Sequence, residues 1–307
     1  MEWIIARWVT FVATLLVTGA CAVALALAPR FTGDEETRHA MTRDAARLGI
    51  GAILALIPAS FLRLADQVMA LRSPGDPILQ GVDVLLMSTT WGSGFLWQSA
   101  ATLVAGIGCW LAARHPRATP WWLVATAGAL GLCATPALQG HAIGSEERTA
   151  LAVAADVAHV FGGSVWLGAL GVIAWLSITL PNADGVRDPD HSARADARLR
   201  ALVPLVPPLA LTGAVLLIVS GVVATVMHLQ AVSDLWLVAW GRYVLAKTVL
   251  VCVIVALGAL NWRRLGPRLA LHADVSAMRK SLVTELLLAL LVLIITAMLV
   301  VTPLPGE

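Results

Sequence analysis

Charged side chains are scarce in this sequence. Asp, Glu, Lys and Arg make up 13% of its 307 residues, about half the share found in soluble domains. Hydrophobic residues make up 59% and the mean hydropathy is +0.83, which excludes both a soluble enzyme and a disordered chain. Lys and Arg number 21 against 19 Asp and Glu, so the basic excess that nucleic-acid binding requires is missing. We therefore expect a polytopic membrane protein surrounded by lipid, with no nucleic-acid partner.

Cysteines and catalytic motifs are also sparse. The four cysteines, Cys21, Cys109, Cys133 and Cys252, lie in apolar runs and form no Cys-x-x-Cys pair, so neither a disulfide framework nor a zinc site is indicated. The sequence has no His-Glu-x-x-His and no Gly-x-Ser-x-Gly, and residues 241–248 lack the second glycine of a phosphate-binding loop. We expect neither a hydrolase nor an ATP-driven pump, and we predict that the protein is not an enzyme.

Long apolar runs predict eight transmembrane helices, because about 20 apolar residues suffice for a helix to cross a bilayer. The expected spans are 8–28, 48–70, 84–112, 120–140, 151–180, 204–228, 240–262 and 281–303. The predicted fold is an all-α membrane helix bundle. We divide it into an N-terminal half, residues 1–140, and a C-terminal half, residues 141–307.

Basic residues gather in alternate connections between the expected spans. They are Arg30, Arg38, Arg43 and Arg47 before the second span, Arg114 and Arg117 before the fourth, Arg187, Arg194, Arg198 and Arg200 before the sixth, and Arg263, Arg264, Arg268, Arg279 and Lys280 before the eighth. The loops and the chain start on the opposite side carry Arg7, Arg72 and Arg148. By the positive-inside rule the basic connections are cytoplasmic, so we expect both termini on the extracytoplasmic side.

Residues 91–98 and 240–247 resemble each other. Both segments begin with Trp-Gly and open a span that runs inwards, and Arg114 and Arg263 follow the two tryptophans at equal distances. An internal repeat would make the two halves parallel four-helix units, as in some transporters. The alternative is that Trp-Gly marks only the aromatic belt where a helix enters the membrane.

Polar residues within the spans lie mostly toward the outer side. An ionisable side chain at bilayer depth costs about 2.5 to 3.5 kcal/mol, so each one needs a partner or a function. The outer halves or outer ends of the spans carry Arg63, Asp66, Gln67, Asp83, Gln98, His141, Asp156, His159, His228, Arg242 and Lys247. The inner halves carry little beyond Glu285 and Asn261. This asymmetry predicts a polar chamber that opens to the outside, in which Arg242 and Lys247 pair with Asp66, Asp83 or Asp156.

Three histidines on the outer side are candidate metal ligands. His141 ends the fourth span, His159 lies about two turns into the fifth, and His228 closes the sixth beside Met227. Imidazole nitrogen together with thioether sulfur favours Cu(I), and Asp156, one turn before His159, could orient its ring. Two histidines on neighbouring helices also meet the requirement of a bis-histidine haem b. The simplest alternative is that His141 and His228 cap helices at the interface and His159 bonds a neighbouring helix.

Several strings, in this order, resemble the copper resistance protein D (CopD) family of bacterial inner-membrane proteins with eight spans. They are residues 140–142 (Gly-His-Ala), 158–168 (Ala-His-Val-Phe-Gly-Gly-Ser-Val-Trp-Leu-Gly), 220–221 (Ser-Gly), 241–247 (Gly-Arg-Tyr-Val-Leu-Ala-Lys), 258–267, Glu285 and 302–305 (Thr-Pro-Leu-Pro). The resemblance is clear over residues 140–305, and in the N-terminal half it rests on layout more than on motifs. Unlike family members with basic residues at the corresponding positions, this chain has Ser93 and Gln98, so a charge-balancing role of that half is not supported.

The resemblance implies copper transport from the periplasm across the inner membrane, alongside a periplasmic copper-binding protein of the CopC type. The family's histidines fall on His141 and His159. Our first hypothesis is a copper transporter with an outer site formed by His141, His159, His228 and Met227. The second is a haem b electron carrier, and the third is a partner-binding membrane subunit without a metal.

Overall fold

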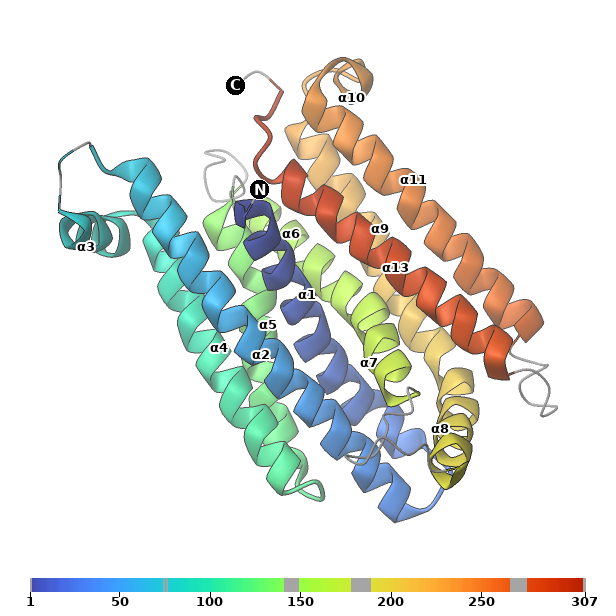
Figure 1. Cartoon of the computed structure of the whole chain (residues 1–307). Coiled ribbons are helices and arrows are strands. Elements are labelled where there is room, and N and C mark those ends of the chain that lie inside the picture. The colour runs from blue at the N-terminus through green and yellow to red at the C-terminus, as the bar shows by residue number, and fades with distance from the viewer. Residues whose placement is uncertain are drawn as a thin grey trace.

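The computed structural model describes residues 2–73, 75, 77–140, 149–177, 189–265 and 275–305. Eight helices in these ranges are long and apolar enough to cross a membrane. They are Trp3–Arg30, Glu35–Leu71, Thr90–Arg114, Thr119–Gln139, Ala150–Leu176, Leu199–His228, Ala239–Leu265 and Val275–Leu299. The predicted all-α bundle of eight spans is confirmed, and both ends of the chain lie at the same end of the bundle (Figure 1).

Some spans combine several helical segments. The first consists of α1 (Glu2–Ala22), a π-helical turn (Val23–Leu27) and a 3-10 turn (Ala28–Arg30); the fifth consists of α6 (Thr149–Gly163), a π-helical turn (Ser164–Gly168) and α7 (Ala169–Leu176). The sixth combines the end of α8 (Pro189–Leu202), a 3-10 turn (Val203–Leu205) and α9 (Val206–His228). The others are α2 (Glu35–Leu71), α4 (Thr90–Arg114), α5 (Thr119–Gln139), α11 (Ala239–Leu260) with a π-helical turn (Asn261–Leu265), and α13 (Val275–Leu299). Short helices α3 (Ile78–Ser88) and α10 (Asp234–Leu237) lie in the connections, as does the first part of α8.

The second span begins at Glu35, and the predicted start at residue 48 was wrong. Asp34 caps this helix: its Oδ1 accepts a hydrogen bond from the backbone N–H of Thr37 at 2.6 Å, and this bond lowers the pKa of Asp34. An ion pair of 3.1 Å between Arg38 and Glu35 supports the first turns. Capping and ion pairs extend a helix beyond the apolar run that predicts the membrane crossing.

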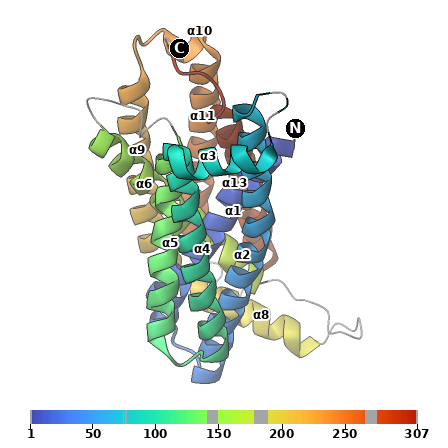
Figure 2. The ribbon, with the colours of Figure 1, turned by 90° about the vertical axis from the view of Figure 1, so that its left-hand side faces the viewer.

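The third span starts at Thr90 instead of residue 84. The chain is extended at Thr89, whose hydroxyl accepts a hydrogen bond from the backbone N–H of Gly92 at 2.9 Å and so caps α4. The apolar residues before this break form α3, which lies across the end of the bundle (Figure 2). In the connection before the sixth span, the basic residues predicted to lie in a loop belong in part to α8, which projects sideways at the other end (Figure 2).

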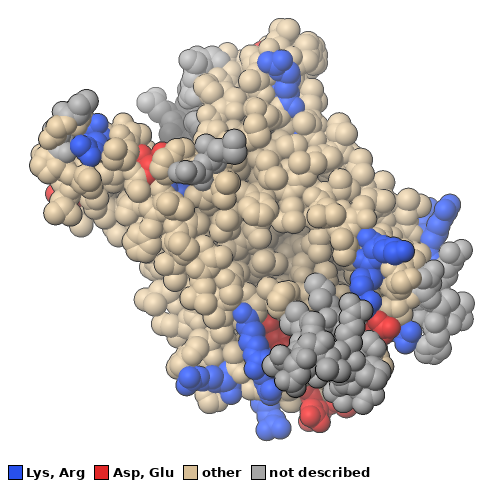
Figure 3. Space-filling model, in the orientation of Figure 1, with Lys and Arg blue, Asp and Glu red and all other residues tan. Residues whose placement is uncertain are grey.

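Lys and Arg gather at the end of the bundle away from the termini. Figure 3 shows them on the lower part of one face, with a band free of charged groups across the middle. Arg279 of α13 forms a 2.7 Å ion pair there with Asp196 of α8. This distribution matches the predicted alternation of basic connections, although Arg148, Arg187 and Arg268 lie outside the described residues.

The first and fifth spans cross at the centre of the bundle through two glycines. A Cβ atom on Gly168 would lie 2.1 Å from the carbonyl oxygen of Leu15, and one on Gly19 would lie 2.2 Å from the carbonyl carbon of Gly168. Both clashes involve backbone atoms, which cannot move aside as a side chain can. Small residues at this crossing therefore allow the helix backbones to touch.

The two halves share a pairing scheme but differ in how tightly they close. In the N-terminal half α1 packs on α2, α2 on α4, and α4 on α5; in the C-terminal half α6 packs on α9, and α11 on α13. Among the described residues, α9 and α11 pack less closely than α2 and α4, whose places they occupy, although the ring centroids of His228 on α9 and Trp240 on α11 are 6.3 Å apart. The C-terminal half is therefore the more open of the two.

Corresponding glycines of the two halves have similar surroundings. A Cβ on Gly92 would lie 2.1 Å from the carbonyl oxygen of Leu85, and one on Gly241 would lie 2.1 Å from that of Asp234. In each half the glycine at the start of the third helix touches the short helix before it. The same sequence offset relates Gly19 to Gly168. These equivalences agree with the predicted internal repeat.

Candidate functional site

His159 lies on α6 at its contact with α9. A Cβ on Gly162 would lie 2.7 Å from the backbone nitrogen of Leu217 and 2.8 Å from the carbonyl oxygen of Gly213. The two helices thus approach closely within one turn of His159. This approach places the partly buried imidazole of His159 against the backbone of α9, inside the C-terminal half.

The ring of His159 is held by α9 through Nδ1. The carbonyl oxygen of Leu217 lies 2.9 Å from Nδ1, and the hydroxyl oxygen of Ser220 lies 3.4 Å away. Because a carbonyl oxygen can only accept, Nδ1 carries the ring proton and donates it to Leu217. The other ring nitrogen, Nε2, is then the one with a free lone pair. Sequence patterns do not reveal this backbone partner.

Lys247 of α11 covers that second nitrogen. Its Nζ lies 3.0 Å from Nε2 of His159, and with Nδ1 protonated the lysine is the donor of this hydrogen bond. This contact is a side-chain hydrogen bond between the α6–α9 pair and α11. The lysine therefore spans the side on which the backbones of α9 and α11 pack loosely.

The charge pairs predicted for the outer side are only partly represented among the described residues. Asp156, one turn before His159 on α6, interacts electrostatically with Lys247. Asp66 interacts instead with Arg63 and Arg7. The side chains of Arg242 and Asp83, also considered as pairing residues, are exposed.

The other predicted ligands are not gathered around His159. His228 lies seven residues beyond Gly221, or about 10 Å farther along α9, and its Nδ1 is 2.8 Å from the carbonyl oxygen of Ala224. Met227 packs against the small buried cluster of Ala137 and Ala152, near the start of α6. His141 lies outside the described residues. In the part of the chain that the structure describes, no three His, Cys, Asp or Glu side chains are grouped to hold a metal ion.

A chain of hydrogen bonds occupies the corresponding level of the N-terminal half. Arg63 donates to Oε1 of Gln139 at 2.6 Å, Gln139 donates to Oε1 of Gln98 at 3.2 Å, and Gln98 donates to the hydroxyl of Ser60 at 2.7 Å. Gln98 occupies the position that Lys247 has in the C-terminal half, as the alignment of the two segments predicts. Here the polar groups satisfy one another and tie α2, α4 and α5 together.

Toward the other end of the C-terminal half, Glu285 is buried with neutral partners. The amide of Asn261 donates to Oε1 of Glu285, and Ser281 donates to Oδ1 of Asn261 at 2.7 Å. Glu285 is only 3% exposed. The sequence indicated Glu285 and Asn261 as inner polar residues, but Ser281 carried no signal because one serine in a helix is unremarkable.

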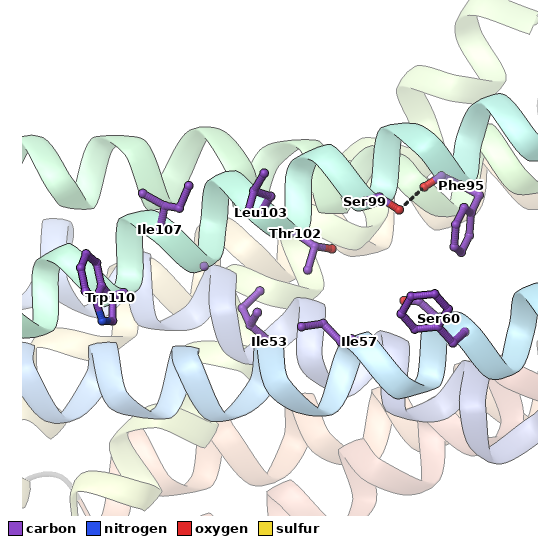
Figure 4. A pocket seen from close by; sticks show the side chains of 11 residues that line it. Ile53, Ile57, Ser60, Phe95, Ser99, Thr102, Leu103, Ile107 and Trp110 are labelled. Carbon is purple, nitrogen blue, oxygen red and sulfur yellow. Dashed lines mark hydrogen bonds between the residues drawn. The ribbon is translucent and has the colours of Figure 1, made fainter.

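An open groove of about 490 Å³ lies between α2 and α4. Its lining is mostly apolar, and the polar groups in it are the hydroxyls of Ser60, Ser99 and Thr102 (Figure 4). Its described lining contains no histidine, cysteine, methionine or charged side chain. This groove therefore does not offer the ligands that copper requires.

Comparison with known proteins places the chain among copper resistance proteins. The family model for Copper resistance protein D matches residues 207–299, and that for the Copper resistance protein D-like N-terminal domain matches residues 1–151. The Copper transport protein CutJ of Bacillus subtilis (strain 168) is 24% identical over 230 residues, which cover 74% of this chain and 40% of CutJ. The chain thus spans less than half the length of this relative. No solved structure matches the chain.

The two family models follow each other along the sequence in the same order as the two halves of the bundle. The model for Copper resistance protein D includes Leu217 of α9, which holds the ring of His159, and Lys247, which covers the ring. The resemblance inferred from motifs is therefore confirmed, and the chain belongs to the copper resistance protein D family.

Proposed function

We propose that this protein transports copper across the membrane, inward from the outer side, and that Nε2 of His159 receives the ion. The observation that carries the proposal is the fixed tautomer of His159. Its bond to Leu217 holds the proton on Nδ1, which leaves Nε2 as a neutral imidazole ligand within a span. The family of the chain and its similarity to a protein named for copper transport support copper as the cargo.

The direction of transport rests on the orientation of the bundle. The end away from the termini carries the basic connections, and basic loops remain in the cytoplasm. Both termini and His159 would then lie toward the extracytoplasmic side. In a bacterium this means the inner membrane, with the periplasm facing His159, where a CopC-like copper-binding protein could deliver the ion.

Further ligands would come from residues at the outer end of the same helices. Met227, at the end of α9, packs against Ala137 of α5 and Ala152 of α6 and offers a thioether. His228 closes α9, and His141 precedes α6 in the sequence. A set of imidazole and thioether groups suits Cu(I). An ion would pass these residues on its way to His159, which makes the protein a carrier and not an enzyme.

The haem alternative receives no support. Neither the family models nor the similar copper transport protein points to haem. An axial haem ligand needs one free nitrogen and a second histidine on the opposite face of the porphyrin. Of the described histidines, His228 lies about two turns farther along α9 than the contact of His159 with that helix.

Uptake by reconstituted protein tests the proposal. We expect liposomes containing the purified protein to accumulate Cu(I), measured by a trapped copper-sensitive dye, and we expect His159→Ala to abolish this uptake. His115→Ala, which alters an exposed histidine at the end of α4, is the matched control and should transport normally. Equal uptake by wild type and His159→Ala would contradict the assignment of His159. No uptake by any form would favour the metal-free subunit.

Cysteine labelling tests the orientation independently. Val232→Cys, in the connection before α10, should react in intact cells with a maleimide that cannot cross the membrane. His115→Cys, at the opposite end of the bundle, should react only after the cells are opened. The reverse pattern would invert the direction of transport.

A further inference from the structure

Lys247 directs its ammonium group at the one nitrogen of His159 that could bind a metal. The Nζ to Nε2 distance is 3.0 Å, and Nδ1 is committed to Leu217. An imidazole nitrogen has one lone pair in the ring plane, so it accepts either a hydrogen bond or a metal ion. The two uses of Nε2 exclude each other.

We infer that Lys247 is a built-in competitor of copper: the ion binds Nε2 of His159 only when the lysine ammonium leaves that nitrogen and turns to Asp156. This inference rests on the proposed function, because it assumes that copper reaches His159. The inference assigns to Lys247 the role of setting the copper affinity of the site. It also explains how Nε2 of His159 is covered when no copper is bound.

The exchange keeps the number of positive charges at the imidazole nearly constant. Copper brings a positive charge to Nε2 as the ammonium leaves, so the buried site avoids holding two adjacent cations. Asp156 stands on the same helix as His159, one turn away, and already interacts electrostatically with Lys247. The flexible four-carbon stem of a lysine allows the ammonium to move between two such partners.

The packing around α11 favours such movement. Among the described residues, α11 packs mainly on α13, and its backbone packs loosely against α9, with His228 and Trp240 in ring contact near the ends of the two helices. Thr248 and Val249, next to the lysine, are exposed. Release of Lys247 would remove the described side-chain hydrogen bond between α11 and α6, so copper binding and the loosening of α11 would occur together.

A purely structural role for Lys247 predicts the opposite response to substitution. If the lysine only clamped α11 to α6, its loss would disturb His159 and leave copper affinity unchanged or weaker. If it competes, its loss frees Nε2 at all times. Apparent affinity is reduced by the fraction of time that a site is blocked, so competition predicts tighter binding.

Copper affinity of purified variants distinguishes the two roles. We expect Lys247→Met to bind Cu(I) about tenfold or more tightly than wild type, measured by competition with the chelator bicinchoninate. Arg242→Met removes a cation from an exposed position of the same helix and should bind within about twofold of wild type. Unchanged or weaker binding by Lys247→Met, in protein whose unfolding temperature matches that of Arg242→Met, would overturn the inference.

Asp156→Asn provides a second variant, which keeps both Nζ of Lys247 and Nε2 of His159. It removes the alternative partner of the ammonium, so copper binding should weaken several-fold. The same change made in Lys247→Met protein should have little effect, because no ammonium remains to be moved. An equal loss in both backgrounds would show that Asp156 acts on His159 directly and would contradict the exchange.

A measurement without copper separates this inference from the transport proposal. Diethyl pyrocarbonate modifies neutral imidazole nitrogen, and mass spectrometry reports its reaction at each histidine. We expect His159 to react faster in Lys247→Met than in wild type or Arg242→Met. If this increase is seen and copper uptake survives His159→Ala, the lysine covers the nitrogen but copper takes another route. If the increase is missing, the covering contact itself is refuted.

Discussion

Gly221 of α9 stands directly beside the imidazole of His159. A Cβ atom at Gly221 would lie 3.0 Å from Cε1 and 3.2 Å from Nδ1 of the ring. These distances are shorter than ordinary van der Waals contacts. The glycine therefore provides the space in which the ring can lie between Leu217 and Lys247.

Gly221→Ala should consequently weaken copper binding roughly tenfold, as expected when the groups that orient a metal ligand are disturbed. The new methyl group should displace the ring by a few tenths of an ångström and so weaken its hydrogen bond to Leu217. Cu(I) affinity by chelator competition measures the effect. Gly51→Ala is the control, because a Cβ there meets nothing within 4 Å. Wild-type affinity in Gly221→Ala would mean that the ring position does not matter for binding.

Gly168→Ala should destabilise the whole bundle. Its Cβ would lie 2.1 Å from the carbonyl oxygen of Leu15, and the two central spans would have to separate. Overpacking of this kind costs about 1 to 3 kcal/mol or more. Unfolding in detergent, followed by circular dichroism, checks this prediction with Gly51→Ala alongside. A stability equal to that of Gly51→Ala would show that the crossing can widen without cost.

The sequence was sufficient to predict the bundle, because apolar runs and basic connections report directly on the membrane. It failed where helices extend beyond lipid. α2 starts at Glu35 because Asp34 caps it and Arg38 pairs with Glu35, and neither feature is apolar. The break at Thr89 depends on a single capping hydroxyl inside an apolar run. Hydropathy is insensitive to both.

The sequence indicated individual residues of the candidate site but not the contacts between them. His159 and Lys247 were both conspicuous, since ionisable side chains are rare in spans. Their contact was not predictable, because it joins α6 to α11 across many intervening residues and depends on which helices are neighbours. The carbonyl of Leu217 also determines the chemistry of the ring, and any residue type could have supplied it.

The cap of α2 should depend on pH. The pKa of Asp34 is lowered in the folded protein by the hydrogen bond from Thr37. Its contribution is therefore complete above the pKa of Asp in the unfolded chain, and it is lost as the pH falls through the lowered pKa. Hydrogen exchange of the amides in the first turn should accelerate over that range. Asp34→Asn caps a helix without titrating, so its exchange should lack this pH-dependent acceleration.

Breaking the polar chain of the N-terminal half should cost stability but not copper affinity. Gln139→Leu leaves Arg63 without its 2.6 Å partner and Gln98 without one donor. Loss of hydrogen bonds to a charged group costs about 1.5 to 3 kcal/mol. We expect earlier unfolding with Cu(I) affinity near that of wild type. A marked loss of affinity would instead mean that the two halves share one copper site.

The cluster around Glu285 offers a similar test in the C-terminal half. Asn261→Ala removes the amide that donates to the buried carboxyl group, so we expect a loss of about 1 to 3 kcal/mol in the free energy of unfolding. Ser281→Ala should cost less, because it only releases the orienting bond to Asn261. Thr284→Ala, an exposed neighbour whose hydroxyl bonds to its own helix, should be nearly neutral. Ser281→Ala made in Asn261→Ala protein should add nothing, because the serine acts through the amide it orients. Additive losses would mean that the two residues stabilise α13 separately.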